Sequence, residues 1–180
     1  KNGLLHLPRL KLSPHTPDFF TLNSLPFDFN PTDTDPKAFN AFLYELFGDD
    51  TESKNALQEI FGYLLTNDTD QQKIFIIVGP KRAGKGTLAR IATALLGQEN
   101  VAGPTLSSLT NNFGLQVLIG KPLAIISDAR LSGKADQSVI TERLLSISGQ
   151  DFLTIDRKYR DPWTGQLSTR CVLMTNELPR

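Results

Sequence analysis

The sequence is poor in the residues that form disulfides and metal centres. It contains one cysteine, Cys171, and two histidines, His6 and His15, which do not cluster. A single cysteine excludes an internal disulfide and is typical of a reducing compartment. Without a cluster of cysteine and histidine, a zinc site is not expected. Cys171 lies in the apolar run CVLM, which favours a buried thiol over a reactive one.

An excess of charge of either sign is also missing. The 19 Lys and Arg residues balance 19 Asp and Glu residues, so the formal net charge is zero. A surface coated in basic charge is therefore excluded, although a local groove for nucleic acid stays open. No apolar run approaches the roughly 18 residues needed to cross a membrane, and no signal peptide opens the chain. We therefore expect a cytoplasmic protein without a membrane partner.

The chain divides into three segments with different residue patterns. Residues 1–35 hold five prolines and short alternating apolar runs, which predict a β-hairpin followed by an irregular arm. Residues 36–70 contain two amphipathic stretches, typical of helices over about 36–47 and 52–66. Residues 71–180 alternate apolar strands with helices, which predicts a mainly parallel sheet covered on both faces. The side chains expected to hold the arm against the core are Phe19, Phe20, Phe27 and Phe29.

Residues 71–180 contain several elements that can be placed individually. Three apolar runs, IFIIV, LAII and CVLM, predict buried strands. One helix is expected to end at Gly97, and another to run from about Gln137 to Ile147. A β-ribbon is expected around DPWTG, with its turn set by Pro162 and Gly165.

A glycine-rich loop follows the first of these strands and opens a helix. Phosphate binding needs backbone N–H groups turned inward, a lysine for the β- and γ-phosphates, and a helix N-terminus that favours anions. The loop supplies all three, which predicts a site for ATP. The alternative is a glycine-rich turn whose cationic side chains are merely solvated. The candidate nucleotide-binding residues are Gly79, Pro80, Lys81, Arg82, Ala83, Gly84, Lys85, Gly86 and Thr87.

The loop departs from the common phosphate-binding pattern at one position. The residue after the lysine is usually Ser or Thr, whose hydroxyl binds Mg²⁺. Here Gly86 occupies that position, and the hydroxyl comes one residue later, at Thr87. Adenylate kinases also carry the sequence GKGT, so the loop alone does not separate a nucleotide kinase from an ATPase motor.

Two other predicted strands end in polar residues. Asp128 follows LAII, and Mg²⁺–nucleotide chemistry uses a carboxylate in this position, expected beside the strand of the glycine loop. The alternative is a polar residue that starts a loop. The usual second acid is missing, because alanine and arginine come next, and Asp136 and Glu142 are candidates for its role as base. Asn176 lies just after CVLM, where its amide can orient the attacking water or sense the γ-phosphate, although TNELP taken alone is typical of a turn.

Several motifs, in order, resemble those of phage and plasmid primase–helicases, which carry a superfamily 3 helicase domain. They are GPKRAGKGT, QENVAGPTL, LIGKPLAIISDARLSG, RLLSISGQD, LTIDRKYRDPWTG and VLMTNELPR. The resemblance covers nearly the whole chain, including NGLLHL and HTPDFF near its start. It implies an α/β fold of the AAA+-like P-loop NTPase class, with a parallel-sheet core preceded by the hairpin arm and the helical segment. Because the chain begins at Lys1 and its only methionine is Met174, we expect a piece of a longer protein, truncated after the third motif.

The resemblance also implies roles for individual residues. Lys85, Asp128 and Asn176 would be catalytic: the lysine on the phosphates, the aspartate on Mg²⁺ and the asparagine as the polar sensor. Thr87 would be the second metal ligand. The arginine finger of the family lies beyond the third motif, so we assign it to no residue here.

Members of this superfamily carry a β-hairpin between the second and third motifs, and this hairpin contacts DNA in the channel of a ring. The matching candidates here are Arg157, Lys158, Tyr159 and Trp163. Cations interleaved with aromatics suit a strand held by phosphate charge and base stacking. The alternative is an ordinary hairpin whose Trp163 packs on the core.

These patterns together predict the ATP-dependent DNA helicase core of a phage- or plasmid-type primase–helicase. We expect ATP and Mg²⁺ as cofactors, single-stranded DNA as partner, a homo-hexameric ring, and a primase domain upstream. A nucleoside monophosphate kinase is an alternative function because of GKGT, although no arginine-rich lid is evident. A nucleotide-binding assembly module without turnover stays open because the second acid is missing.

Overall fold

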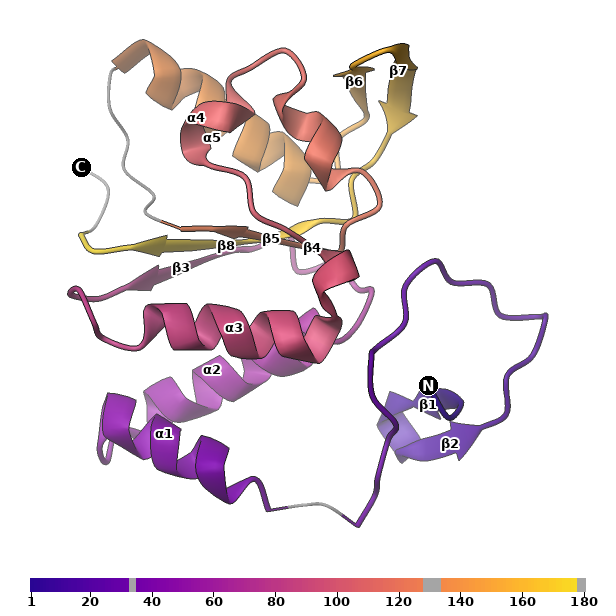
Figure 1. Cartoon of the computed structure of the whole chain (residues 1–180), viewed down its shortest axis with the longest axis vertical. Coiled ribbons are helices and arrows are strands. Elements are labelled where there is room, and N and C mark those ends of the chain that lie inside the picture. Colours follow the sequence, from indigo (N-terminus) through magenta and orange to yellow (C-terminus); the bar gives the residue numbers. More distant parts are fainter. Residues whose placement is uncertain (33–34, 128–133, 178–180) are drawn as a thin grey trace.

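A four-stranded parallel sheet lies at the centre of the structure (Figure 1), a computed structural model that describes residues 1–32, 35–127 and 134–177, without the side chains of 134–136. The strands lie side by side in the order β3 (Ile74–Val78), β8 (Arg170–Thr175), β5 (Leu123–Ile126) and β4 (Val101–Ala102). Every neighbouring pair is parallel. The three runs that predict strands therefore do form strands, and β4 joins them.

Helices lie on both faces of this sheet, which confirms the predicted α/β class (Figure 1). The helices on the lower face in the view of Figure 1 are α1 (Lys37–Phe47), α2 (Thr51–Leu64) and α3 (Lys85–Leu96). Those on the upper face are α4 (Leu106–Leu109), the 3-10 helix η3 (Gly114–Leu118) and α5 (Lys134–Ser148). A further 3-10 turn, η2 (Gln98–Asn100), leads from α3 into β4. No helix within the described ranges has the length and apolar character needed to cross a membrane.

The ends of α1 and α2 follow from the residues that flank them. Pro36 precedes the first turn of α1, and Gly48 ends that helix with a φ of 55°, a conformation that glycine adopts without strain. The Asp50 side chain accepts a hydrogen bond from the Ser53 backbone N–H at 3.0 Å and so caps α2. Both predicted helices are confirmed to within two residues at each end.

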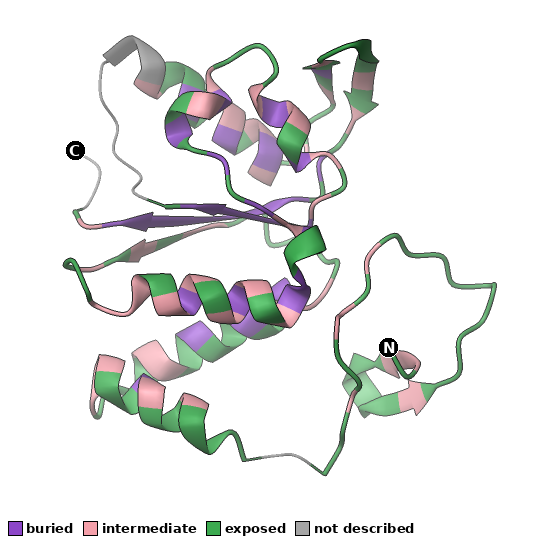
Figure 2. Cartoon of the chain, viewed as in Figure 1, coloured by how far each residue is buried: buried purple, intermediate pink, exposed green. Residues whose placement is uncertain are grey.

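The sheet separates two apolar clusters, because alternate residues of a strand point to opposite faces. On β8, Cys171 and Leu173 belong to the upper cluster with α4, η3 and α5, whereas Val172 and Met174 belong to the lower one. Figure 2 shows the buried residues concentrated on β5, β8 and the inward faces of the helices. The lower cluster combines side chains of α1 and α2 with those of α3 and the sheet, so residues 37–64 share one core with the strand and helix of the glycine loop.

The strand before the glycine loop is less buried than its sequence predicts. Ile76 and Val78, which share one face of β3, are exposed, because β3 lies at the edge of the sheet. The prediction of a sheet covered on both faces is therefore wrong at this edge, as far as the described residues go. The expected neighbour is also wrong: β8 lies between β3 and β5, so the LAII strand is not adjacent to the strand of the loop.

A buried arginine, Arg170, joins α2 to the sheet. Its side chain is 3% exposed and donates from Nη1 to the carbonyl oxygens of Tyr63, at 2.8 Å, and of Thr66. Its Nε donates to the carbonyl oxygen of Pro122 at 3.2 Å, and its carbon Cζ lies 5.5 Å from the centre of the Tyr63 ring. Burial lowers the pKa of this guanidinium, which nevertheless stays charged at any ordinary pH.

The buried thiol of Cys171 gives a direct test of the packing around β8. Its side chain is 2% exposed, as the sequence predicts, and burial raises its pKa to about 12. We expect no alkylation by iodoacetamide at pH 8 in the native protein and rapid alkylation in denaturant. An unfolded thiol ionises near pH 8.5, so the unfolded state alone loses this proton and the free energy of unfolding falls as the pH rises from about 9 toward 12. Rapid native labelling would contradict this packing.

An antiparallel β-ribbon lies between α5 and β8 in the sequence. Its strands are β6 (Leu153–Arg157) and β7 (Arg160–Gly165). The ribbon is confirmed, but the predicted turn is wrong: Lys158 and Tyr159 form it, with Tyr159 at a φ of 60°. Pro162 lies inside β7 and Gly165 pairs with Leu153 at the far end of the ribbon. Pro162 is tolerated there because a two-stranded ribbon has only edge strands, where a missing N–H costs little.

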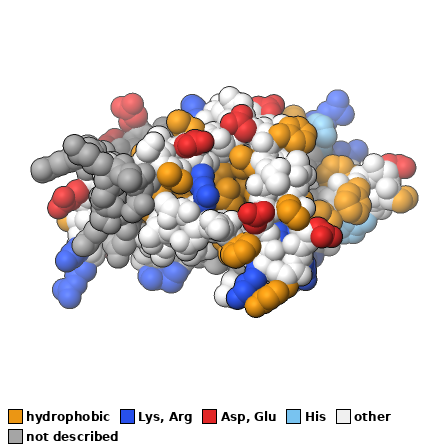
Figure 3. Space-filling model, turned by 90° about the horizontal axis from the view of Figure 1, so that it is seen from above, with side chains coloured by type: hydrophobic (Ala, Val, Ile, Leu, Met, Phe, Trp, Pro, Cys, Tyr) orange, Lys and Arg blue, Asp and Glu red, His pale blue; other side chains and the backbone are white. Residues whose placement is uncertain are grey.

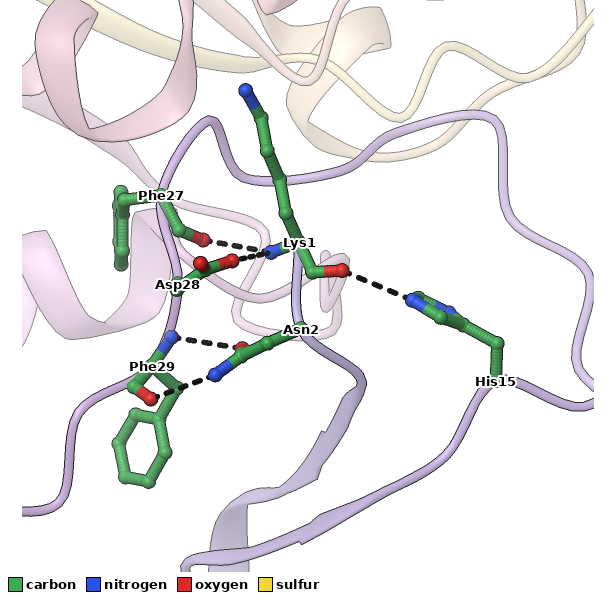
Figure 4. A network of polar contacts seen from close by, with 6 residues as sticks. All are labelled: Lys1, Asn2, His15, Phe27, Asp28 and Phe29. Carbon is green, nitrogen blue, oxygen red and sulfur yellow. Dashed lines mark hydrogen bonds and ion pairs between the residues drawn. The ribbon is translucent and has the colours of Figure 1, made fainter.

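The N-terminal arm forms a loop that closes on itself (Figure 1). It starts with β1 (Leu4–His6), the 3-10 turn η1 (Leu7–Arg9) and β2 (Lys11–Ser13), which confirms the predicted hairpin. Figure 4 shows how the segment before β1 meets the chain again 27 residues later: Asn2 donates to the Phe29 carbonyl and accepts from its N–H, both at 3.0 Å. The amino group of Lys1 donates to the Phe27 carbonyl and forms an ion pair with the Asp28 carboxylate. The His15 ring contacts the Lys1 carbonyl and completes this network.

The expected anchoring of the arm by its phenylalanines is wrong for three of the four. Phe19, Phe20 and Phe27 are exposed, and only Phe29 is half-buried. A hydrogen bond attaches the arm to the core instead, from the Asn100 side chain to the Ser24 carbonyl at 3.1 Å. A polar contact of this kind leaves no apolar periodicity in the sequence.

Candidate nucleotide site

A hollow of about 540 Å³ lies over the loop between β3 and α3. The loop begins where Gly79 donates its N–H to the Thr175 carbonyl at 3.2 Å, at the carboxyl end of the adjacent strand β8. Seven of the nine predicted nucleotide-binding residues line this hollow, joined by one residue of α3 and one that follows β8. The lining residues are Lys81, Arg82, Ala83, Gly84, Lys85, Gly86, Thr87, Arg90 and Asn176.

Glycine is required at the turn from the loop into α3. Gly84 precedes the helix with a φ of 76°, and a Cβ built on it would lie 2.6 Å from Cδ2 of Leu46 on α1. The backbone conformation therefore strains any other residue here, and a Cβ would also force the Leu46 side chain to shift. Within the described residues, the backbone N–H groups of Arg82, Gly84, Lys85 and Gly86 have no acceptor, so the loop and the first turn of α3 offer them to an anion.

Lys85 lies over the loop and reaches across to the neighbouring strand. Its Nζ donates to the carbonyl oxygens of Gly79 at 2.6 Å and Pro80 at 2.8 Å, and to Oδ1 of Asn176 at 3.0 Å. Asn176 is 91 residues away in the sequence, yet it meets the lysine because β3 and β8 are parallel neighbours. The structure thus brings together two of the three predicted catalytic residues.

The hydroxyl of Thr87 contacts an arginine that the sequence does not single out. Arg90 donates from Nη2 to Oγ1 of Thr87 at 2.9 Å and lines the same hollow. Position 90 lies three residues after Thr87 and four after Gly86, so the three share one side of α3. This helical spacing is the signal that points to Arg90, but only once the loop is taken as a binding site.

The charge of the hollow is strongly one-sided among the described residues. Lys81, Arg82, Lys85 and Arg90 line it, and no carboxylate does. This lining suits a polyphosphate group, and the hydroxyl of Thr87 is an oxygen ligand that Mg²⁺ accepts.

The carboxylates considered from sequence contribute nothing to this described lining. Asp128 lies outside the described residues, as does the side chain of Asp136, and Glu142 is exposed on α5 without lining the hollow. No group of three or more acidic, histidine or cysteine side chains gathers elsewhere in the described part of the chain. Of the two predicted metal ligands, Thr87 and Asp128, Thr87 therefore lies within the described residues and lines the hollow.

The turn of the β6–β7 ribbon lies at the opposite end of the sheet from the hollow (Figure 1). The Lys158 backbone N–H donates to the Gln116 side chain of η3 at 2.7 Å, which fixes the turn against the upper layer. Lys158 Nζ lies 5.1 Å from the ring centre of Tyr159, which is 93% exposed at the tip. Arg157 donates from Nε to the Asp161 carbonyl at 2.8 Å.

Trp163 is separate from these residues. It is half-buried, pairs with Ile155 across the ribbon and packs against the upper cluster. The arrangement matches the alternative in which this ring packs on the core. On the part of the face coloured by side-chain type in Figure 3, cationic, anionic and apolar side chains are interspersed without a large area of one sign, in keeping with the zero net charge.

The arrangement as a whole is a mixed α/β fold with a glycine-rich loop at the carboxyl edge of a parallel sheet. Residues 77–180 match the family DUF5906, described as a family of unknown function, and the chain belongs to that family.

Solved structures with the same fold include the apo C-terminal region of NrS-1 (305–718), with a TM-score of 0.68 and 18% identity. The match covers 82% of this chain and 35% of that one. JCV helicase, solved with a bound acetamide compound, has a TM-score of 0.52 and 21% identity, over 78% of this chain and 40% of the other. The chain thus spans little more than a third of the length of these structures, and at such identities the likeness establishes the fold alone.

Proposed function

We propose that this chain is the ATP-hydrolysing core of a DNA helicase of the phage or plasmid primase–helicase type, with the ATPase core in residues 71–180. The observation that carries the proposal is the contact of Lys85 with Asn176 in a hollow lined by four cations. A lysine and a strand-end amide that meet over a glycine loop suit an ATP γ-phosphate. The likeness of fold to JCV helicase supports the same reading.

The described geometry supports a separate role for each group in the site. The unpaired N–H groups of the loop would hold the phosphate oxygens, and Lys85 would leave the Gly79 and Pro80 carbonyls to meet the β- and γ-phosphates. The Asn176 amide, freed from the lysine, would orient the attacking water. Thr87 and Asp128 would hold Mg²⁺, which when bound neutralises the charge that develops on the phosphate oxygens.

We further propose single-stranded DNA as the partner and a homo-hexameric ring as the working assembly, in the cytoplasm and with a primase domain upstream. Residues 1–35 would form an arm and residues 36–70 a helical support for the ATPase core, whose apolar side chains α1 and α2 share. Arg157, Lys158 and Tyr159 would contact DNA, because Lys158 and Tyr159 form an exposed turn far from the hollow and Arg157 ends the strand that leads into it. Trp163 would act indirectly by fixing the ribbon on the core.

Lys158→Ala is expected to weaken binding of single-stranded DNA without affecting ATP binding. Each lost phosphate contact lowers the slope of log K against log salt by roughly 0.7 for single strands. Fluorescence anisotropy with labelled oligothymidylate at several salt concentrations measures this slope. Lys73→Ala, at an exposed lysine before β3, is the matched control and should leave it unchanged. An unchanged affinity and slope for Lys158→Ala would remove the DNA-contacting role of the turn.

The reaction itself is tested against the kinase alternative by following the products formed from ATP. We expect inorganic phosphate and ADP from ATP alone, with no additional ADP formed when AMP is added. Conversion of AMP to ADP would replace the helicase proposal with a nucleotide kinase. Tight ATP binding without any product, in the presence of Mg²⁺ and DNA, would replace it with an assembly module.

A further inference from the structure

Gly86, the residue after the loop lysine, lies beside the side chain of Arg90. A Cβ built on Gly86 would have a single described neighbour within 4 Å, Nη1 of Arg90 at 3.7 Å. Residues 86 and 90 are one helical turn apart on α3, so the guanidinium lies beside the place where other phosphate-binding loops carry a metal-binding hydroxyl. A Cβ at position 86 would make only an ordinary van der Waals contact with this guanidinium, which lines the same hollow.

Among the described residues, Arg90 makes one hydrogen bond, and its other N–H donors have no acceptor. Its Nη2 donates to Oγ1 of Thr87 at 2.9 Å, which is its one hydrogen bond among the described residues. A guanidinium carries five N–H donors in a planar fork that matches phosphate oxygens. No described carboxylate lies within ion-pair distance of it, since the described ion pair of the chain is that of Lys1 with Asp28. Its charge is thus available to an anion in the hollow that it lines.

We propose that Arg90 is a phosphate-binding residue of this site, and that it supplies part of the charge neutralisation that other loops obtain from Mg²⁺ at the residue after the lysine. The inference rests on the proposed function, because it takes a nucleoside triphosphate as the ligand. Arg90 holds the Thr87 hydroxyl until the nucleotide enters, and then donates its fork to the terminal phosphates. The site consequently binds ATP even when Mg²⁺ is removed.

Calorimetry of ATP binding to the full chain tests this role in two buffers, one with Mg²⁺ and one with EDTA. In EDTA we expect Arg90→Ala to bind ATP about ten- to a hundredfold more weakly than the unmodified chain. In Mg²⁺ the loss is smaller, because the metal takes over part of the neutralisation. Arg90→Lys keeps the charge without the fork and is expected to fall between the two. Arg9→Ala removes an exposed arginine of the arm and should change neither value.

The outcomes separate this inference from the proposed function. If Arg90→Ala binds ATP in EDTA as tightly as the unmodified chain, or if the unmodified chain needs Mg²⁺ to bind at all, the role of Arg90 is overturned while the nucleotide site stands. If the unmodified chain binds no ATP in either buffer, both are overturned. Arg90 is exposed on α3, so neither variant disturbs the core, and matching thermal melts of the variants verify this.

Discussion

Lys85→Ala is expected to abolish ATP hydrolysis and to weaken ATP binding by at least about tenfold. In the described structure Lys85 lines the hollow, and its Nζ is held between two loop carbonyls and Asn176. Losing a charge-assisted contact to phosphate costs about 1.5–3 kcal/mol, which corresponds to roughly 10- to 150-fold in affinity. Calorimetry with ATP and Mg²⁺ measures the loss directly.

The matched control for this experiment is Lys11→Ala, at an exposed lysine on β2 of the arm. It removes the same charge from the chain without touching the hollow, so ATP affinity should not change. Equal affinity of Lys85→Ala and the unmodified chain for ATP would contradict the assignment of the glycine loop as a phosphate site.

Arg170→Ala is expected to lower the free energy of unfolding by about 2–4 kcal/mol. The change leaves a cavity under α2 and removes the donors that reach the carbonyls of Tyr63, Thr66 and Pro122. For a chain of this size the loss corresponds to a fall in Tm of roughly 4–16 °C. Thermal denaturation followed by circular dichroism measures it.

Two further variants identify the cause of that loss. Arg170→Met refills most of the volume without a charge and should recover part of the stability, because apolar replacements of buried charges are often tolerated. Arg9→Ala, at an exposed position, should stay within about 0.5 kcal/mol of the unmodified chain. A melt of Arg170→Ala that coincides with that of the unmodified chain would show that the buried guanidinium does not join α2 to the sheet.

The sheet and most helices could be predicted because their residues carry a local pattern. Runs such as IFIIV and LAII fix strands, and apolar residues at helical spacing fix α1, α2 and α3. Strand order carries no such local signal, since it is decided by which strands pack together across long separations. For this reason the insertion of β8 between β3 and β5 was not predictable from either strand.

The predictions of the ribbon turn and of the arm's anchoring were wrong for one reason. In both, residues do not follow their usual preference for a turn or for burial. Pro162 and Gly165 favour turns, yet Tyr159 adopts the left-handed conformation and the ribbon turns there, while η3 holds the adjacent Lys158 N–H. Phe19 and Phe20 favour burial, yet they are exposed on an arm that polar contacts hold in place.

The candidate site was largely predictable because its residues follow from phosphate chemistry. Glycines, a lysine and a helix start identify the loop from sequence, whereas the contact of Asn176 with Lys85 follows from the pairing of β8 with β3 and was not predictable. Arg90 was not predictable, because a lone arginine on an amphipathic helix is normally part of a solvated face. Its proximity to Gly86 and Thr87 becomes visible only when all three are placed on one side of α3.

Release of inorganic phosphate from ATP, measured with and without single-stranded DNA on the full chain, tests the central proposal most directly. A motor whose DNA-contacting turn and nucleotide hollow act together should hydrolyse ATP in a Mg²⁺-dependent reaction that DNA accelerates. Lys85→Ala should eliminate the activity, and Lys158→Ala should eliminate only the acceleration. Phosphate release at the same rate with and without DNA, or none in either condition, would contradict the proposal of an ATP-driven DNA helicase core.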